Sequence, residues 1–257
     1  MFLYLLLIAG CYTVPETGRL ALSLLPQGQE VALGESAFEE IKAQETLSTN
    51  HEQIATVERV GSRIAQAAHD DMPDAEWEFV LFDNDEMVNA FALPGGKIGV
   101  YSGLFQLVDT DDDLAVVMGH EVAHVTARHG AERYSQQLAV AAGAMALDVA
   151  TADRDASMRQ SLMLAYGAGA TVGILLPYSR RAEREADEIG LLYSARAGYD
   201  PRIAPEFWRR MAEEAANRPS PPEFLSTHPS YATRIEVLEE TMPRALAYYE
   251  EARTNRN

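Results

Sequence analysis

Residues 110–130 read TDDDLAVVMGHEVAHVTARHG, and this stretch decides the fold. Thr110 or Asp111 caps the start of a helix, because a short oxygen-bearing side chain accepts hydrogen bonds from the first free backbone N–H groups. Further aspartates stand in the first turn, where the helix dipole favours acids. The apolar residues that follow continue the helix to about His129, and a glycine ends it.

His120, Glu121 and His124 form an H-E-x-x-H pattern inside this predicted helix. Residues four apart differ by about 40° around a helix axis, so His120 and His124 point the same way and can bind one ion. Glu121 is close enough to reach a water at that ion. The pattern predicts a zinc site, and the structural alternative is a pair of partly buried histidines on an amphipathic helix.

A catalytic zinc needs a third protein ligand, and it must be His, Asp or Glu because the chain has a single cysteine, Cys11. Glu183 and Asp187 are four residues apart in another predicted helix and share one face. Glu183 is a candidate ligand, and Asp187 is a candidate hydrogen-bond partner for a ligand histidine. On its own, such a pair is typical of a solvated helix face. Glu185 points elsewhere and is the weaker candidate.

The rest of the chain predicts an α+β fold that is mostly α. Apolar residues recur at helical spacing on both sides of a short region where the period changes to that of strands. We therefore expect one domain with a small, mainly antiparallel sheet inserted early. Further helices are expected at about 30–49, 51–69, 132–152, 155–168, 178–197, 201–216 and 230–252, and strands at 77–82, 88–93 and 98–101.

The apolar stretch Leu162–Leu176 is too short for a membrane span, because a transmembrane helix needs about 20 apolar residues. Three glycines also interrupt it. We expect a buried or interfacial segment here.

The amino terminus indicates a lipid anchor. Residues 1–10 are almost wholly apolar, and two small residues precede Cys11, as in a bacterial lipobox. We expect a signal segment over 1–10, lipidation of Cys11, a tether over 11–29 and the folded domain over 30–252. A lipid there would make the protein anchored rather than membrane-spanning. The alternative is a truncated signal sequence with a chance cysteine.

The net charge of −18 argues against a nucleic-acid partner, since it repels phosphate backbones. The acidity is concentrated in residues 30–121, which hold 20 acidic side chains and four basic ones. Composition is otherwise ordinary for a globular protein, with 47% hydrophobic residues.

Four motifs together resemble one family of zinc metallopeptidases, that of the CAAX prenyl protease, HtpX and the Oma-type mitochondrial protease. The likeness is greatest to soluble periplasmic lipoprotein members such as LoiP and BepA, without the tetratricopeptide repeats of BepA. The motifs are Asn89–Gly96, His120–His124, Tyr178–Asp187 and Thr227–Ile235.

This resemblance implies a gluzincin fold, with the sheet above the active-site helix and an edge strand along the cleft. It implies one Zn²⁺ per chain with Glu183 as its third ligand, and Glu121 as the general base. His228 is expected to support the oxyanion, with Arg234 or Tyr231 as alternatives. Helix geometry, apart from the resemblance, rotates His129 about 140° from His124, so His129 is expected to point away from the ligands. The substrate edge strand would comprise Asn89, Ala90, Phe91 and Ala92.

The expected function is hydrolysis of peptide bonds in unfolded or misassembled proteins of the bacterial envelope, on its periplasmic side. The expected partner is an extended polypeptide, and the only expected membrane contact is the lipid anchor. Two alternatives remain: a non-proteolytic chaperone or scaffold with a structural zinc, and a zinc amidase that acts on cell-wall peptides.

Overall fold

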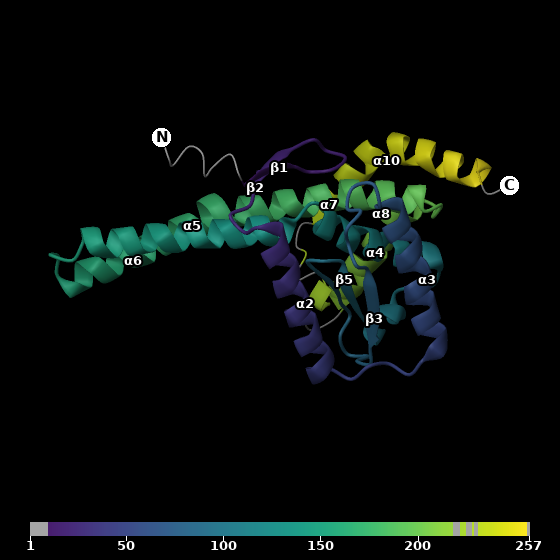
Figure 1. Ribbon diagram of the computed structural model, residues 1–257, viewed down its shortest axis with the longest axis horizontal. Coiled ribbons are helices and arrows are strands. Elements are labelled where there is room, and N and C mark those ends of the chain that lie inside the picture. Colours follow the sequence, from purple (N-terminus) through teal and green to yellow (C-terminus); the bar gives the residue numbers. More distant parts are fainter. Residues whose placement is uncertain (1–9, 218–221, 225–227, 229–230, 256–257) are drawn as a thin grey trace.

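The computed structural model describes residues 10–217, 222–224, 228 and 231–255, the side chains of 231–233 excepted. The described part is mostly helical with a small sheet, which confirms the predicted α+β class. Figure 1 shows a body of helices around the sheet, from which one pair of helices projects. The body contains α2 (Gln27–Gln44), α3 (His51–Ala67), the 3₁₀ turn η1 (Ser102–Gln106), α4 (Asp111–Thr126), α7 (Leu176–Arg196), α8 (Ile203–Asn217) and α10 (Tyr231–Thr254).

The three-stranded sheet is mixed. β3 (Glu78–Phe82) pairs in parallel with β5 (Lys97–Tyr101), and β4 (Ala90–Leu93) pairs antiparallel with the other side of β5. The expectation of an antiparallel arrangement therefore holds for β4 but not for β3, because the chain passes to the far edge before it returns through the middle. Gly95 and Gly96 form the β4–β5 turn with φ of 89° and 91°, which glycine adopts without strain. β4 is thus an edge strand, and it lies against α4.

α4 and α7 cross at very short distance. A Cβ added to Gly119 of α4 would lie 2.6 Å from the backbone oxygen of Gly190 of α7, and a Cβ on Gly190 would lie 2.7 Å from the backbone of Gly119. Only glycine permits such an approach. Because His120 directly follows Gly119, the crossing brings the two helices that carry the candidate ligands together.

α4 begins as the sequence predicts and ends earlier. Oγ1 of Thr110 accepts a hydrogen bond from the N–H of Asp113, and the Asp113 carboxylate accepts one from the N–H of Thr110, which makes a capping box. The helix ends at Thr126 rather than near His129, because Arg128 takes the left-handed conformation with φ of 53°. His129 then begins a new helix.

Residues 11–29, which we expected to form a tether, are folded onto the domain. β1 (Cys11–Thr13) and β2 (Leu20–Leu22) form an antiparallel hairpin, with Cys11 exposed at its start. Val14 is completely buried, and the hydroxyl of Tyr12 donates a hydrogen bond to the backbone oxygen of Ala127 at 2.9 Å. The strands are only three residues long, so their sequence carries no visible period.

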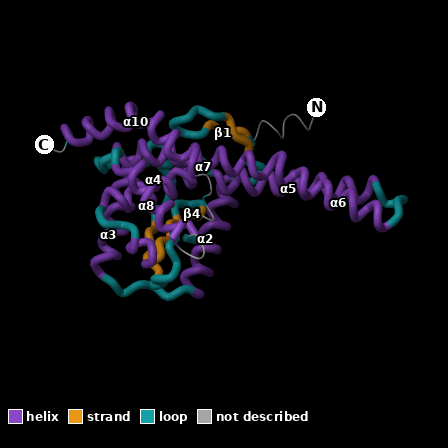
Figure 2. The backbone as a smooth tube through the Cα atoms, turned by 180° about the vertical axis from the view of Figure 1, so that it is seen from behind, coloured by secondary structure: helices purple, strands orange, loops and turns teal. Residues whose placement is uncertain are grey.

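The projecting pair consists of α5 (His129–Ala150) and α6 (Ala156–Ala170). α6 continues through a π-helical turn, η2 (Thr171–Leu175), into α7, and both views show the pair extending away from the body (Figures 1 and 2). Leu162–Leu176, expected to be buried or interfacial, is not buried inside the protein, since most of these residues are exposed. Nothing in the described part of the body lies over this portion of the helix pair, so its apolar side chains remain uncovered.

Candidate metal centre

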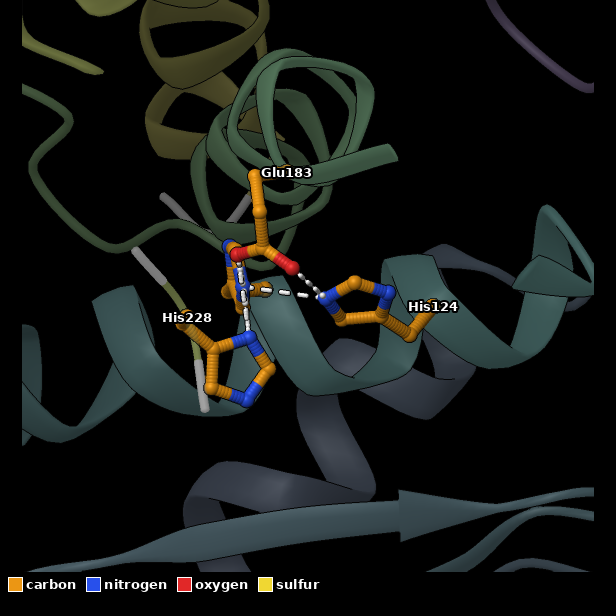
Figure 3. A group of neighbouring side chains, drawn as sticks. His124, Glu183 and His228 are labelled. Carbon is orange, nitrogen blue, oxygen red and sulfur yellow. Dashed lines mark hydrogen bonds and ion pairs between the residues drawn. The ribbon is translucent and has the colours of Figure 1, made fainter. Parts of the chain in front are cut away.

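Four side chains from three parts of the chain converge beside α4. His120 and His124 come from α4, Glu183 comes from α7, and His228 lies shortly before α10. One ligand atom from each residue lies within 4.8 Å of all the others. Figure 3 shows Glu183 reaching from its helix toward His124, with the ring of His228 on the other side of the carboxylate.

The distances inside this cluster suit a tetrahedral metal ion. Nε2 of His120 lies 3.1 Å from Nε2 of His124, 3.2 Å from Nδ1 of His228 and 3.3 Å from Oε2 of Glu183. Oε1 of Glu183 lies 3.6 Å from Nε2 of His124. Ligands about 2.1 Å from a zinc ion in a tetrahedron are roughly 3.4 Å from one another. The four distances are therefore close to those between the ligands of one ion, in a set whose ligand atoms all lie within 4.8 Å of one another.

The outer nitrogen of His120 is held by a carboxylate. Nδ1 of His120 lies 2.9 Å from Oδ1 of Asp187, the contact expected from the sequence. The other oxygen of Asp187 accepts a hydrogen bond from Nε of Arg234 at 2.8 Å. Arg234 is 2% exposed, also donates to Oε2 of Glu183 at 3.2 Å, and lies over the ring of Trp208. This arrangement fixes the His120 proton on Nδ1 and leaves Nε2 to face the cluster.

A second chain of contacts holds the outer nitrogen of His124. Nδ1 of His124 lies 2.9 Å from Nδ1 of His129, and Nε2 of His129 lies 3.0 Å from Oε2 of Glu185. Arg19, in the N-terminal hairpin, donates to both oxygens of Glu185 and also binds Glu132. The prediction that His129 points away is wrong, because α4 ends before it and helical geometry no longer applies.

The pKa shifts of the clustered side chains indicate a site suited to a cation. Burial alone would lower the pKa of His120, but its hydrogen bonds with Asp187 and Glu183 outweigh this effect and raise the pKa to about 9. Burial lowers the pKa of His124 well below its ordinary value. Burial would raise the pKa of Glu183, but hydrogen bonds from His120 and His228 hold it well below the usual range. The anionic carboxylate of Glu183 and the neutral imidazole of His124 thus face the same point, and the raised pKa of His120 shows that this point attracts positive charge, which a metal ion would supply in place of the His120 proton.

Glu121 adjoins the cluster from α4. Its side chain is buried, and this burial raises its pKa above the ordinary value. Among the described residues, Oε1 of Glu121 has no hydrogen-bond partner and lies 3.5 Å from Nε2 of His228. A buried carboxylate oxygen without a donor is costly, so this oxygen is suited to accept a hydrogen bond from a water or a substrate group.

A cleft of about 370 Å³ opens beside these residues. Phe91, Ala92 and Leu93 of β4 lie along it, and so do Glu121 and the candidate ligands His124, Glu183 and His228. The lining also includes residues at the base of the projecting helices, among them Gln137, Leu175 and Leu176. The edge strand and the cluster therefore share one cavity, in which an extended chain beside β4 would pass the cluster.

The other residues predicted for the site have different surroundings. Asn89 is buried, and its backbone oxygen accepts a hydrogen bond from the N–H of Tyr101. Ala90 is buried at the start of β4. Tyr231 begins α10, but its side chain lies outside the described residues.

Arg19 and His129 belong to the site although the sequence did not predict them there, and Glu185 belongs to it although it was expected to be the weaker candidate. Glu185 is buried and pairs with His129, and two strong donors hold its pKa at about 2 in spite of that burial. The one available signal for Arg19 was its isolation, as the only basic residue before Lys42. No local pattern predicts the left-handed Arg128, so the position of His129 could not be read from spacing.

The site has the arrangement of a metallopeptidase centre. It combines two histidines of one helix, a glutamate from a second helix and a buried glutamate beside a cleft. The chain belongs to peptidase family M48, whose family model matches residues 51–242. This match confirms the resemblance seen in the four motifs. The protein is therefore a hydrolase that acts on polypeptides and binds a divalent metal, and the cluster is suited to hold that metal.

Similar proteins carry the same activity in their names. The mitochondrial metalloendopeptidase OMA1 of Schizosaccharomyces pombe is 35% identical over 235 residues, which cover 90% of this chain and 66% of the relative. The OMA1 of Saccharomyces cerevisiae is 32% identical over 96% of this chain and 76% of its own length. The beta-barrel assembly-enhancing protease of Escherichia coli is 32% identical over 87% of this chain, but this region is only 46% of that protein.

Proposed function

We propose that the protein is a zinc-dependent endopeptidase in which His120, His124 and Glu183 hold the metal. The observation that carries this proposal is the convergence of these donors next to the buried, unpartnered oxygen of Glu121. Two imidazoles and a carboxylate, without a thiolate, form the ligand set of catalytic zinc in many hydrolases. One such ion per chain fits the cluster.

The substrate would bind as an added strand along β4. This strand pairs with β5 on one side only, and three of its side chains lie along the cleft. A polypeptide that pairs with a free strand edge is bound through its backbone, so it must be extended but needs no particular sequence. Unfolded or misassembled proteins meet this requirement. We assign residues 89–92 to this substrate edge.

Glu121 would act as the proton carrier. Zinc, when bound, polarises the scissile carbonyl and acidifies a water. Oε1 of Glu121 would take a proton from that water and deliver it to the leaving amine, because a buried carboxylate with a raised pKa is suited to both directions of transfer. Arg234 would position Asp187 and Glu183, to which it donates hydrogen bonds.

His228 would have two positions. With Nδ1 facing Glu183 and His120, it completes a set of four donors, and such a set describes a closed site. Catalysis needs one open position, so we propose that His228 leaves the cluster when substrate binds. Support of the oxyanion, the role expected of His228 from the sequence, would then fall to its alternatives Tyr231 or Arg234.

The amino terminus and the likeness to a bacterial protease support a location in the bacterial envelope. We propose that the protein works on the periplasmic side of a bacterial envelope, with Cys11 as a lipidation site. Its substrates would be misassembled envelope proteins. The exposed position of Cys11 and the name of the Escherichia coli relative support this assignment.

The test of the activity is Glu121→Gln, assayed on unfolded casein beside Glu52→Gln, which changes an exposed glutamate on α3. Glu121→Gln should lower the cleavage rate by about 10²- to 10⁴-fold and leave zinc content and the circular dichroism spectrum unchanged. Glu52→Gln should cleave normally, and a zinc chelator should stop both the wild type and this control. Cleavage retained by Glu121→Gln would refute the role of Glu121. A protein that binds zinc but never cleaves casein would favour a chaperone or a scaffold.

A further inference from the structure

The projecting helix pair leaves an unusual amount of apolar surface uncovered. Between residues 133 and 177, Ser135, Thr151 and Ala170 are the only buried residues. Large hydrophobic side chains on the pair are exposed in the described structure: Leu138 43%, Met145 70%, Val149 76%, Met158 47%, Leu162 39%, Leu164 68%, Val172 67%, Ile174 49% and Leu176 43%. Apolar patches of this extent on a protein surface mark a site of interaction.

Charged residues on the helix pair are confined to its two ends. No charged residue occurs over 134–147 or over 160–179. At 1.5 Å per residue these uncharged bands are about 21 Å and about 30 Å long, and the hydrocarbon core of a bilayer is about 30 Å thick. At the tip, Asp148 pairs with Arg159 at 2.5 Å. Arg133, Arg180 and Arg181 stand at the base, next to the body.

The exposed apolar residues surround the second helix rather than forming one stripe. At 100° per residue, Leu162 and Leu164 point about 160° apart, and Val172 and Ile174 point about 160° apart as well. A partner protein or a second copy would cover one face of such a helix. Lipid covers every face, so a helix that is apolar all round is typical of a membrane environment.

Three hydroxyl groups within the uncharged bands are paired inside the helix pair. The hydroxyl of Tyr166 donates to the backbone oxygen of Val140 across the pair at 2.9 Å, and Gly143 leaves room for it. Hydroxyl groups of Ser161 and Thr171 donate to backbone oxygens four residues earlier in their own helix. Internal pairing of this kind is what hydrocarbon requires, because lipid chains offer no hydrogen bonds.

The continuous helix supplies the length that a membrane requires. α6, η2 and α7 together run from Ala156 to Arg196, and this helix contains an apolar window long enough to cross a membrane. Only 11% of that window is buried inside the protein, so it does not serve as a core helix. This differs from two expectations, that Leu162–Leu176 is too short for a membrane span and that a lipid on Cys11 is the only membrane contact.

We propose that the α5–α6 helix pair inserts into a lipid bilayer. The exposed part of the pair, residues 138–147 and 160–174, lies in the hydrocarbon, and the arginines at the base lie among the headgroups. Because Gln137, Leu175 and Leu176 line the cleft, the candidate metal centre then opens close to the membrane surface. This inference stands on the helix pair and does not depend on proteolysis.

The test is partition of the full chain onto vesicles of phosphatidylcholine and phosphatidylglycerol, measured by flotation. A Cys11→Ser background excludes any lipid on that residue. The double variant Leu164→Glu/Val172→Glu should bind the vesicles at least about tenfold more weakly, since a charge in hydrocarbon is costly. The matched control is Leu20→Glu/Leu33→Glu, which changes leucines that are 76% and 57% exposed on the body and should leave the partition unchanged. All four positions are exposed, so the fold should survive, and circular dichroism checks this.

A positional measurement separates the helix pair from the apolar residues 1–10. In the Cys11→Ser background, a nitrobenzoxadiazole label on Leu164→Cys should be quenched by lipids with spin labels on their chains. The same label on Leu33→Cys should not be quenched. Equal partition of the two double variants would overturn the proposal, and so would an unquenched label at position 164. A lipid-free dimer that dissociates on Leu164→Glu/Val172→Glu would overturn it too, in favour of an interface between copies.

Discussion

Nδ1 of His129 lies 2.9 Å from Nδ1 of His124, and the opposite nitrogen of the same ring lies 3.0 Å from Oε2 of Glu185. His124 is thereby held by a histidine–glutamate pair, whereas His120 is held directly by Asp187. An arginine ends each chain of contacts: Arg234 binds Asp187, and Arg19 binds Glu185. The two candidate histidine ligands are thus oriented by separate chains of hydrogen bonds, which fix the ring nitrogen that faces the metal.

We expect His129→Ala to weaken zinc binding by about 10- to 100-fold, the usual cost of losing the partner of a ligand histidine. His124 would then rotate more freely, and its Nδ1 proton would lose its acceptor. Competition with a chromophoric chelator measures the affinity. His51→Ala, which removes an exposed histidine at the start of α3, is the control. Equal affinity of both variants would show that His129 does not orient the site.

The ligand pattern could be read from the sequence because it is local. His120 and His124 are one helical turn apart, and a capped helix fixes their direction whatever surrounds it. The helix runs as predicted from Thr110, with its capping box in place. Glu183 is a candidate from its own helix and from the lack of other ligand types, and the family motif supports it as the third ligand, because no spacing relates α7 to α4.

The rest of the candidate site depends on contacts between distant parts of the chain. Arg19 reaches Glu185 across 166 positions, from a hairpin whose strands are too short to show a pattern. His129 joins the site only because Arg128 adopts a left-handed conformation that its residue type does not predict. The exposure of the projecting helices could not be predicted for a related reason. Apolar residues at helical spacing show that one face of a helix is hydrophobic. They do not show whether the protein's own core or another partner covers that face.

We expect Arg19→Met to reduce the free energy of unfolding by about 3 kcal/mol, because it leaves the buried carboxylates of Glu132 and Glu185 without their main cation. The matched control is Arg59→Met. Arg59 also binds a carboxylate, that of Asp111, but both partners are largely exposed, so its loss should cost less than about 1 kcal/mol. Urea unfolding of the two variants gives the comparison. Similar losses for both would mean that the N-terminal hairpin does not brace the site.

We expect His228→Ala to keep one zinc per chain and to raise the rate of casein cleavage. Three donors remain in the variant, and the position that Nδ1 of His228 takes beside Glu183 becomes open to water. Metal analysis and initial rates at saturating casein measure the two effects. If His228 instead supports the oxyanion throughout turnover, the variant should lose about 10²- to 10³-fold in rate with zinc unchanged. That loss would contradict the closed site proposed above.

The close crossing of α4 and α7 gives the last prediction. Gly190→Ala would place a methyl group 2.7 Å from the backbone of Gly119, where no flexible side chain can yield, so the helices must separate. We expect a loss of about 1–3 kcal/mol in the free energy of unfolding, as for other overpacked cores, together with weaker zinc binding because His120 moves with α4. Gly167→Ala is the control. Gly167 is also helical but has open space around it, and the same change there should stabilise the protein by roughly 0.5–1 kcal/mol. Urea unfolding and chelator competition on both variants decide the matter: if Gly190→Ala behaves like Gly167→Ala in both measurements, the crossing does not set the positions of the ligands.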